Sequence, residues 1–198
     1  MTTLAMSAHR RLMREEEPEW IVWSLVILML VVGLLVRNGV EGRTQSFSAN
    51  GVSLRYPDTW TNRTETGQLF YAADFLSSAQ FPTAVMVRQV PVAEVGRNLT
   101  TLSDIAMAWS TRQGRDLLAY RTINVEQTTV DGQEAVRVEY AYVPQATTGG
   151  SVPVVALAQG FLIRQGDTLT IITLAANANL FEAENGTWQA ILASIDVQ

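Results

Sequence analysis

The stretch "NGVSLRYPDTW" (residues 50–60) carries the first clear strand pattern of the domain that follows it. Val52, Leu54 and Tyr56 alternate with the polar residues Ser53 and Arg55. A period of two is typical of a strand with one buried face. The proline at position 57 ends this strand, and "PDTW" is typical of a turn. The stretch therefore predicts the first strand of a sheet.

Further segments of the same kind follow along the chain. Tight turns are expected at "VDGQ" (130–133) and "QGDT" (165–168), where glycine follows or precedes aspartate between two apolar runs. The predicted strands are "QLFYAADF" (68–75), "TAVMVRQVPV" (83–92), "RTINVEQ" (121–127), "EAVRVEYAYV" (134–143), "VALAQGFLIRQ" (155–165) and "TLTIITLAA" (168–176). Short turns between such strands indicate antiparallel pairing.

Two helices are predicted among these strands. In "TTLSDIAMAWSTRQG" (100–114), Thr101 or Ser103 can cap the helix and Gly114 can end it. Its buried face would carry Ile105, Ala108 and Trp109. The second helix lies in "ANLFEAENGTWQAILASI" (178–195), although a glycine at its centre weakens it. We expect its buried face to carry Phe181, Trp188, Ile191 and Ile195. Antiparallel strands with two helices define an α+β fold.

The residue inventory excludes several chemistries. The chain has no Cys, and all 14 of its basic residues other than His9 are Arg. His9 precedes the predicted domain, so histidine triads, thiol nucleophiles, zinc sites of His or Cys and Schiff-base lysines are unavailable within it. We expect no catalytic residue, metal or cofactor. A carboxylate-based enzyme remains a minor alternative, but the acidic residues form no recognisable motif; they include Asp74, Asp104, Asp116, Asp131, Glu134, Glu139 and Asp167.

The charge of the domain disfavours nucleic acid as a partner. Residues 47–198 carry nine Arg and fourteen Asp or Glu, which gives a net charge of −5. The sequence of the domain shows no cluster of basic residues that could follow the phosphate backbone of a nucleic acid.

An apolar run precedes the domain. From Trp20 to Val36 only Ser24 is polar, and a helix of 17 residues covers about 25 Å, enough to span a thin bilayer. We predict a transmembrane helix over residues 20–36, after a polar tail (1–19) and before a linker (37–46) and the domain (47–198). The anchor residues would be Trp20 and Trp23 at the headgroups, Leu30 and Gly33 within the bilayer, and Arg37 at the far interface.

Two other interpretations of this run stay open. A cleaved signal peptide would have a shorter apolar region and a small-residue cleavage site, which "RNGVEGR" (37–43) does not offer. A buried helix of a soluble protein would be polar on one side. Three Arg before the run and two after it favour a cytoplasmic N-terminus. The domain would then lie on the periplasmic or extracellular side of the cytoplasmic (inner) membrane.

The connection "PQATTGGSVP" (144–153) is the best candidate for a contact surface. It joins two long predicted strands with small, flexible residues, so its tip should face solvent. A plain hairpin connection is the simpler interpretation. The alternative is a loop that docks a partner, with contacts at Gln145, Thr147, Gly149, Gly150 and Val152.

At Tyr56, Pro57 and Trp60 the chain resembles the opening of the PsbP/Mog1-like family, whose domains begin with a strand ending in Tyr-Pro followed closely by Trp. The central helix, "TTVDGQEAVRVEYAY" (128–142), a long hairpin and "ILASI" (191–195) follow in the same order. The likeness covers residues 47–197. It implies an antiparallel sheet flanked by helices, an α/β/α sandwich. The metal-binding histidines of the plant photosystem members have no counterpart in this domain.

The resemblance also implies a mode of action. Members include extrinsic subunits of photosynthetic complexes, a nuclear-transport adaptor and bacterial envelope proteins, and most act by binding proteins. We therefore expect a non-catalytic, single-pass accessory subunit of a bacterial membrane complex, of the electron-transport or photosynthetic kind. Its partners would be integral-membrane subunits and the lipid bilayer. The alternative is a free-standing envelope protein that binds a small or lipidic ligand in a cleft of the domain.

Overall fold

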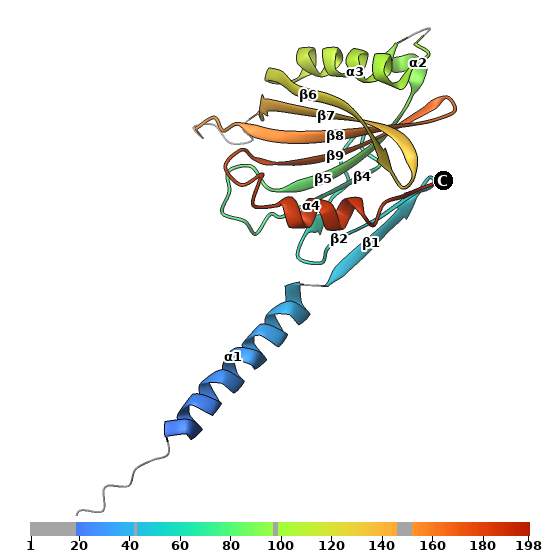
Figure 1. Ribbon diagram of the computed structural model, residues 1–198. Coiled ribbons are helices and arrows are strands. Elements are labelled where there is room, and N and C mark those ends of the chain that lie inside the picture. Colours follow the sequence, from blue (N-terminus) through green and yellow to red (C-terminus); the bar gives the residue numbers. More distant parts are fainter. Residues whose placement is uncertain (1–18, 42, 97–98, 146–151) are drawn as a thin grey trace, which may run out of the picture. The chain divides into compact units, whose positions relative to one another are not determined.

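The computed structural model describes residues 19–41, 43–96, 99–145 and 152–198 (Figure 1). The chain divides into two compact units between residues 42 and 43. The described part of the first unit is the helix α1 (Glu19–Glu41). The second holds an α+β domain with antiparallel sheets, as the sequence predicts.

The helix α1 is longer than the predicted anchor. It covers 23 residues and extends into the predicted linker, whose last residues belong to β1 (Thr44–Ala49). Across the part of the chain that the structure describes, no helix proves both long and apolar enough to cross a membrane. The transmembrane helix over residues 20–36 stays a prediction.

A small sheet begins the domain, in the order β1-β2-β10. The alternation predicted for β2 (Val52–Pro57) is confirmed, since Val52, Leu54 and Tyr56 are buried. Asn50 and Gly51 have φ angles of 47° and 74°, the left-handed conformations that a two-residue hairpin turn requires. Across this turn β1 pairs with β2, so the first residues of β1 lie within the predicted linker. β10 (Asp196–Val197) pairs with the other edge of β2.

The main sheet has seven antiparallel strands in the order β3-β4-β5-β9-β8-β7-β6. The strands are β3 (Thr61–Asn62), β4 (Phe70–Ala73), β5 (Ala84–Pro91), β6 (Leu118–Val130), β7 (Gln133–Val143), β8 (Ala156–Gln165) and β9 (Thr168–Asn177). Both predicted turns are confirmed. Asp131 and Gly132 have positive φ between β6 and β7, and Gly166 has positive φ between β8 and β9.

The helix α3 (Leu102–Asp116) follows the short helix α2 (Val92–Val95). Thr101 is its cap, because the Thr101 hydroxyl oxygen accepts a hydrogen bond from the Asp104 N–H at 3.1 Å. Two details differ from the prediction. Gly114 does not end the helix, which closes instead where the Leu117 N–H donates to the Gln113 carbonyl. Ala106 is fully buried and Ala108 only half-buried.

The closing helix α4 (Asn185–Leu192) is shorter than predicted. Phe181 and Ile195 lie outside it, yet both pack in the same buried cluster as Trp188 and Ile191. The Trp188 indole N–H donates to the Phe181 carbonyl at 3.3 Å, which fixes the incoming turn against the helix. The four residues share a core without sharing a helix.

The main sheet has a different cover on each face (Figure 1). One core cluster packs beneath α3 and includes Ile105, Trp109 and Tyr140. The other packs beneath α4 and the small sheet and includes Leu54, Trp60 and Trp188. Helices therefore flank both faces of the main sheet, as the predicted sandwich requires, and the small sheet adds to the cover on the α4 face. On that face β2 supplies much of the cover, because its alternating residues Val52, Leu54 and Tyr56 are all buried there.

Candidate functional site

Three connections of the main sheet meet at one end, which we call the loop end. They are the β4–β5 connection (74–83), the β7–β8 connection (144–155) and the β9–α4 connection (178–184). The register places them together, because Ala73 pairs with Ala84, Ala84 with Ala175, and Ala156 with Asn177. At the opposite end the sheet turns through the tight hairpins at Gly132 and Gly166. The three connections at the loop end are longer than these hairpins.

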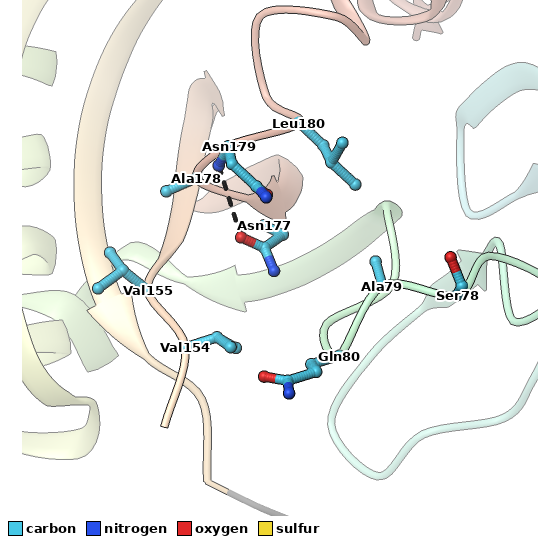
Figure 2. Close-up of a pocket in the computed structure, with 9 residues that line it drawn as sticks. All are labelled: Ser78, Ala79, Gln80, Val154, Val155, Asn177, Ala178, Asn179 and Leu180. Atoms are coloured by element: carbon cyan, nitrogen blue, oxygen red, sulfur yellow. Dashed lines mark hydrogen bonds between the residues drawn. The ribbon is translucent and has the colours of Figure 1, made fainter. Parts of the chain in front are cut away.

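A groove of about 600 Å³ lies among these connections (Figure 2). In Figure 2 the side chains of Gln80 and Val154 point toward each other from opposite walls. The Asn177 side chain accepts a hydrogen bond from the Asn179 N–H at 3.5 Å and so shapes the third wall. The lining residues are Ser78, Ala79, Gln80, Val154, Val155, Asn177, Ala178, Asn179 and Leu180. None of them carries a charge, so the groove suits a neutral ligand with amide-like hydrogen-bonding groups.

The β4–β5 connection presents an apolar residue beside this groove. The Asp74 carboxylate accepts hydrogen bonds from the N–H groups of Leu76 and Ser77, at 3.1 and 3.2 Å. Such a turn holds the backbone through the aspartate side chain. Leu76, two residues before the first groove residue, is 85% exposed, more than any other large apolar side chain of the described residues. These local hydrogen bonds therefore hold the backbone of a turn from which the apolar side chain of Leu76 faces solvent.

Aromatic contacts hold the base of this turn. The Arg63 guanidinium lies 3.7 Å from the centre of the Phe75 ring, and the rings of Tyr71 and Phe75 are 6.2 Å apart. Burial raises the pKa of Tyr71, and the Glu65 carboxylate adds to the rise while Arg63 opposes it. Tyr71 is therefore a neutral aromatic at physiological pH, and the turn rests on a packed base.

The predicted partner loop lies at the same end. Gln145 and Val152 are exposed, and Val152 is 70% exposed. Thr147, Gly149 and Gly150 lie outside the described residues. Just beyond the loop, Val154 and Val155 line the groove, and Val155 is 48% exposed. The predicted contact residues Gln145 and Val152 are not among the groove's lining residues, and sequence reasoning did not single out residues 78–80.

The predicted anchor residues lie in the other unit, within α1. Trp20, Trp23, Leu30 and Gly33 are exposed, and the side chain of Arg37 is outside the described residues. Among the described residues, no three His, Asp or Glu side chains are placed to hold a metal ion. The predicted core tryptophans Trp60, Trp109 and Trp188 are all buried.

The sequence matches no family model and no curated protein. Solved structures, in contrast, share its fold. The cyanobacterial PsbP (CyanoP) of Synechocystis sp. PCC 6803 has a TM-score of 0.54 at 18% identity, over 78% of this chain and 92% of CyanoP. The Ran-binding protein Mog1p of Saccharomyces cerevisiae has a TM-score of 0.52 at 8% identity, over 78% and 95% of the two chains. LpqN of Mycobacterium tuberculosis, described as involved in cell envelope biogenesis, has a TM-score of 0.51 at 9% identity. The match covers 79% of this chain and 91% of LpqN.

These likenesses confirm the PsbP/Mog1-like fold. At such low identity they define the architecture only, since one fold supports many functions.

Proposed function

We propose that this chain is a non-catalytic, membrane-anchored accessory protein that binds a subunit of a membrane protein complex through its loop end. The observation that carries the proposal is Leu76, an apolar side chain that a hydrogen-bonded turn holds 85% exposed beside an uncharged groove. Protein interfaces are built around such apolar anchors on rigid supports. Val152 and Val155 extend the apolar surface across the groove.

The chemistry of the groove favours a neutral segment of a partner protein as its occupant. Ser78, Gln80, Asn177 and Asn179 offer hydroxyl and amide groups, which pair with backbone amides as well as with side chains. A charged segment would lose its solvation without gaining an opposite charge in the groove. The partner surface we infer is therefore a neutral loop that presents backbone amides to the groove and a small apolar pocket to Leu76.

The sequence and the helical state of α1 support the anchor. The run from Trp20 to Val36 contains one polar residue, and all of it lies in a continuous helix. Exposed apolar side chains follow one another along this helix, and contiguous apolar surfaces of this size are usually covered by a membrane or a partner. More narrowly, we propose that the partner complex is of the electron-transport or photosynthetic kind, and that the domain lies on the extracytoplasmic side of the inner membrane.

The likeness to Mog1p, described as Ran-binding, supports protein binding as a use of this fold. It supports neither a particular partner nor a particular surface. The loop-end proposal therefore rests on the geometry of this chain and not on the comparison.

Affinity purification from native membranes tests the proposal. Tagged full-length protein would be isolated in mild detergent, and its companions would be identified and quantified by mass spectrometry. We expect stoichiometric recovery of one integral-membrane complex with the natural sequence. With Leu76→Asp we expect at least a tenfold loss, because a carboxylate would replace a buried apolar anchor.

Met107→Asp is the matched control, because Met107 is also apolar and exposed (56%) but lies on α3. It should leave the recovery unchanged. Equal losses for both variants would contradict docking at the loop end. Recovery of the natural protein alone would contradict the accessory role and favour the alternative, a free-standing envelope protein that binds a ligand.

A further inference from the structure

A second cavity lies on the α3 face of the main sheet and shares no lining residue with the loop-end groove. It has a volume of about 150 Å³, and we call it the tyrosine cavity. Residues from the end of α3 (Gln113 and Leu117) and from β5 (Met86 and Arg88) both line it. Its lining residues are Gln68, Met86, Arg88, Trp109, Gln113, Leu117, Tyr140, Tyr142, Ile171 and Thr173.

Aromatic rings make the inner wall of the tyrosine cavity. Trp109 meets Tyr140 edge to face at 5.8 Å, and Tyr140 lies 5.8 Å from Tyr142. Trp109 reaches this position because β8 carries a glycine beneath it. A Cβ atom at Gly160 would come within 3.0 Å of the Trp109 ring. The wall is therefore fixed and aromatic, which suits a ligand that carries a ring.

The strand register places a cation at the rim. Arg88 pairs with Ile171 and Met86 with Thr173, so these four side chains lie on the same face of β5 and β9. Arg88 is exposed and forms no ion pair with any residue that the structure describes. Burial raises the pKa values of Tyr140 and Tyr142 well above the ordinary value, so both stay neutral. Arg88 is thus the one charged side chain that lines the cavity.

The cavity also has an unpartnered acceptor. The side-chain oxygen Oε1 of Gln68 is buried and has no hydrogen-bond partner among the described residues. The Leu69 N–H donates to the Val87 carbonyl at 2.8 Å, which holds the neighbouring Gln68 beside β5, and Gln68 lines the same cavity as Arg88. A buried acceptor without a partner costs free energy, which a bound donor would recover.

We propose that the tyrosine cavity binds a small aromatic carboxylate that carries a hydroxyl group. The ring would lie against Trp109 and Tyr140, the carboxylate would pair with Arg88, and the hydroxyl would donate to Gln68. The volume agrees with this class, since a cavity of about 150 Å³ accommodates a single six-membered ring. The site lies outside the loop-end groove, so it does not depend on the proposed docking.

Calorimetric titration of the full-length protein in mild detergent tests this inference with three probes. They are 3-hydroxybenzoate, benzoate and benzylamine, which keep the ring and change the charge or the hydroxyl. We expect 3-hydroxybenzoate to bind with a dissociation constant on the order of 0.1 mM, as its size allows. Benzoate should bind about threefold more weakly because it leaves Gln68 unpartnered. Benzylamine should bind at least about tenfold more weakly because its cation meets Arg88.

Three variants assign the binding to the named groups. Arg88→Gln should weaken the binding of both acids about tenfold. Gln68→Leu should abolish the preference for the hydroxyl group. Arg55→Gln, an exposed arginine of the small sheet, is the matched control and should change nothing. Equal affinity for benzylamine and the acids, unchanged binding in Arg88→Gln, or no saturable binding of any probe would each overturn the proposal.

Discussion

The two faces of the main sheet are built from the same strands and are packed very differently. Beneath α4, the small sheet and the helix together close the core, and Trp188, Leu54 and Ile191 are almost completely buried. Beneath α3, a single helix covers only part of the face. Three tyrosine rings, those of Tyr120, Tyr140 and Tyr142, pack there, and a cavity remains beside the helix.

This difference shows that the elements packed on a sheet face determine whether that face is closed or keeps space for a ligand. Successive residues of a strand point to opposite faces, so β7 sends Ala135 to the α4 face and Tyr140 and Tyr142 to the α3 face. The closed face contributes stability. The partly covered face retains space and a few polar side chains, which are the usual features of a small-ligand site.

The largest expected effect compares one tryptophan from each face. Trp188→Ala should lower the free energy of unfolding by about 4 kcal/mol, and Trp109→Ala by about 3 kcal/mol. Trp188 is enclosed by Phe181 and Trp60 and loses its hydrogen bond to the Phe181 carbonyl, whereas Trp109 already borders a cavity. Urea unfolding of the full-length protein, followed by near-ultraviolet circular dichroism, measures both values. A larger loss for Trp109→Ala would reverse the ranking of the two faces.

Alkaline pH should act on the α3 face. Burial raises the pKa values of Tyr140 and Tyr142 in the folded state, while in the unfolded chain they stay near 10. The resulting stability is fully present below about pH 10 and is lost as the pH rises above it, by about 1.4 kcal/mol per pH unit for each tyrosine.

The double variant Tyr140→Phe, Tyr142→Phe tests this pH dependence. Urea unfolding between pH 8 and 11.5 should show a shallower fall for the variant than for the natural protein. Parallel curves would mean that these two tyrosines do not cause the alkaline loss.

The smallest effect concerns the hydroxyl groups that tie α3 to β6. The Ser110 side chain lies 2.8 Å from the hydroxyl oxygens of both Tyr120 and Thr122. Ser110→Ala should lower the free energy of unfolding by about 1 kcal/mol, since it removes hydrogen bonds from a buried position. Ser103→Ala on the same helix, whose contact with Gln127 is 3.4 Å long, should change it by less than about 0.5 kcal/mol. A Ser110→Ala effect as small as the control would show that the network contributes little.

Local patterns predicted most of the strands and turns. The alternation in β2, the cap at Thr101 and the turn at Asp131 and Gly132 each depend on residues a few positions apart. The Asn50–Gly51 turn has an equally local signal, because Asn-Gly is typical of a two-residue hairpin turn, but no turn was predicted there. The small sheet has no local signal for its third strand, because β10 meets β2 from the far side of the sequence.

The sites were harder to predict than the strands. The β7–β8 connection was recognised from its small residues, and the signal for Leu76 was the Asp74 and Ser77 that flank it and close the turn. The tyrosine cavity depends on the register of β5 with β9 and on where α3 ends, which no single segment encodes. Arg88 and Gln68 are unremarkable in the sequence until the sheet brings them together.

The small sheet also affects how the domain folds during its synthesis. The Arg55 N–H donates to the Ser194 hydroxyl, and 139 residues separate the two. During synthesis, the apolar residues of β2 therefore stay uncovered by α4 until almost the whole domain has emerged from the ribosome. Contacts so distant in sequence form slowly, and uncovered apolar strands aggregate. We expect a nascent chain that stops before α4 to depend on a holding chaperone.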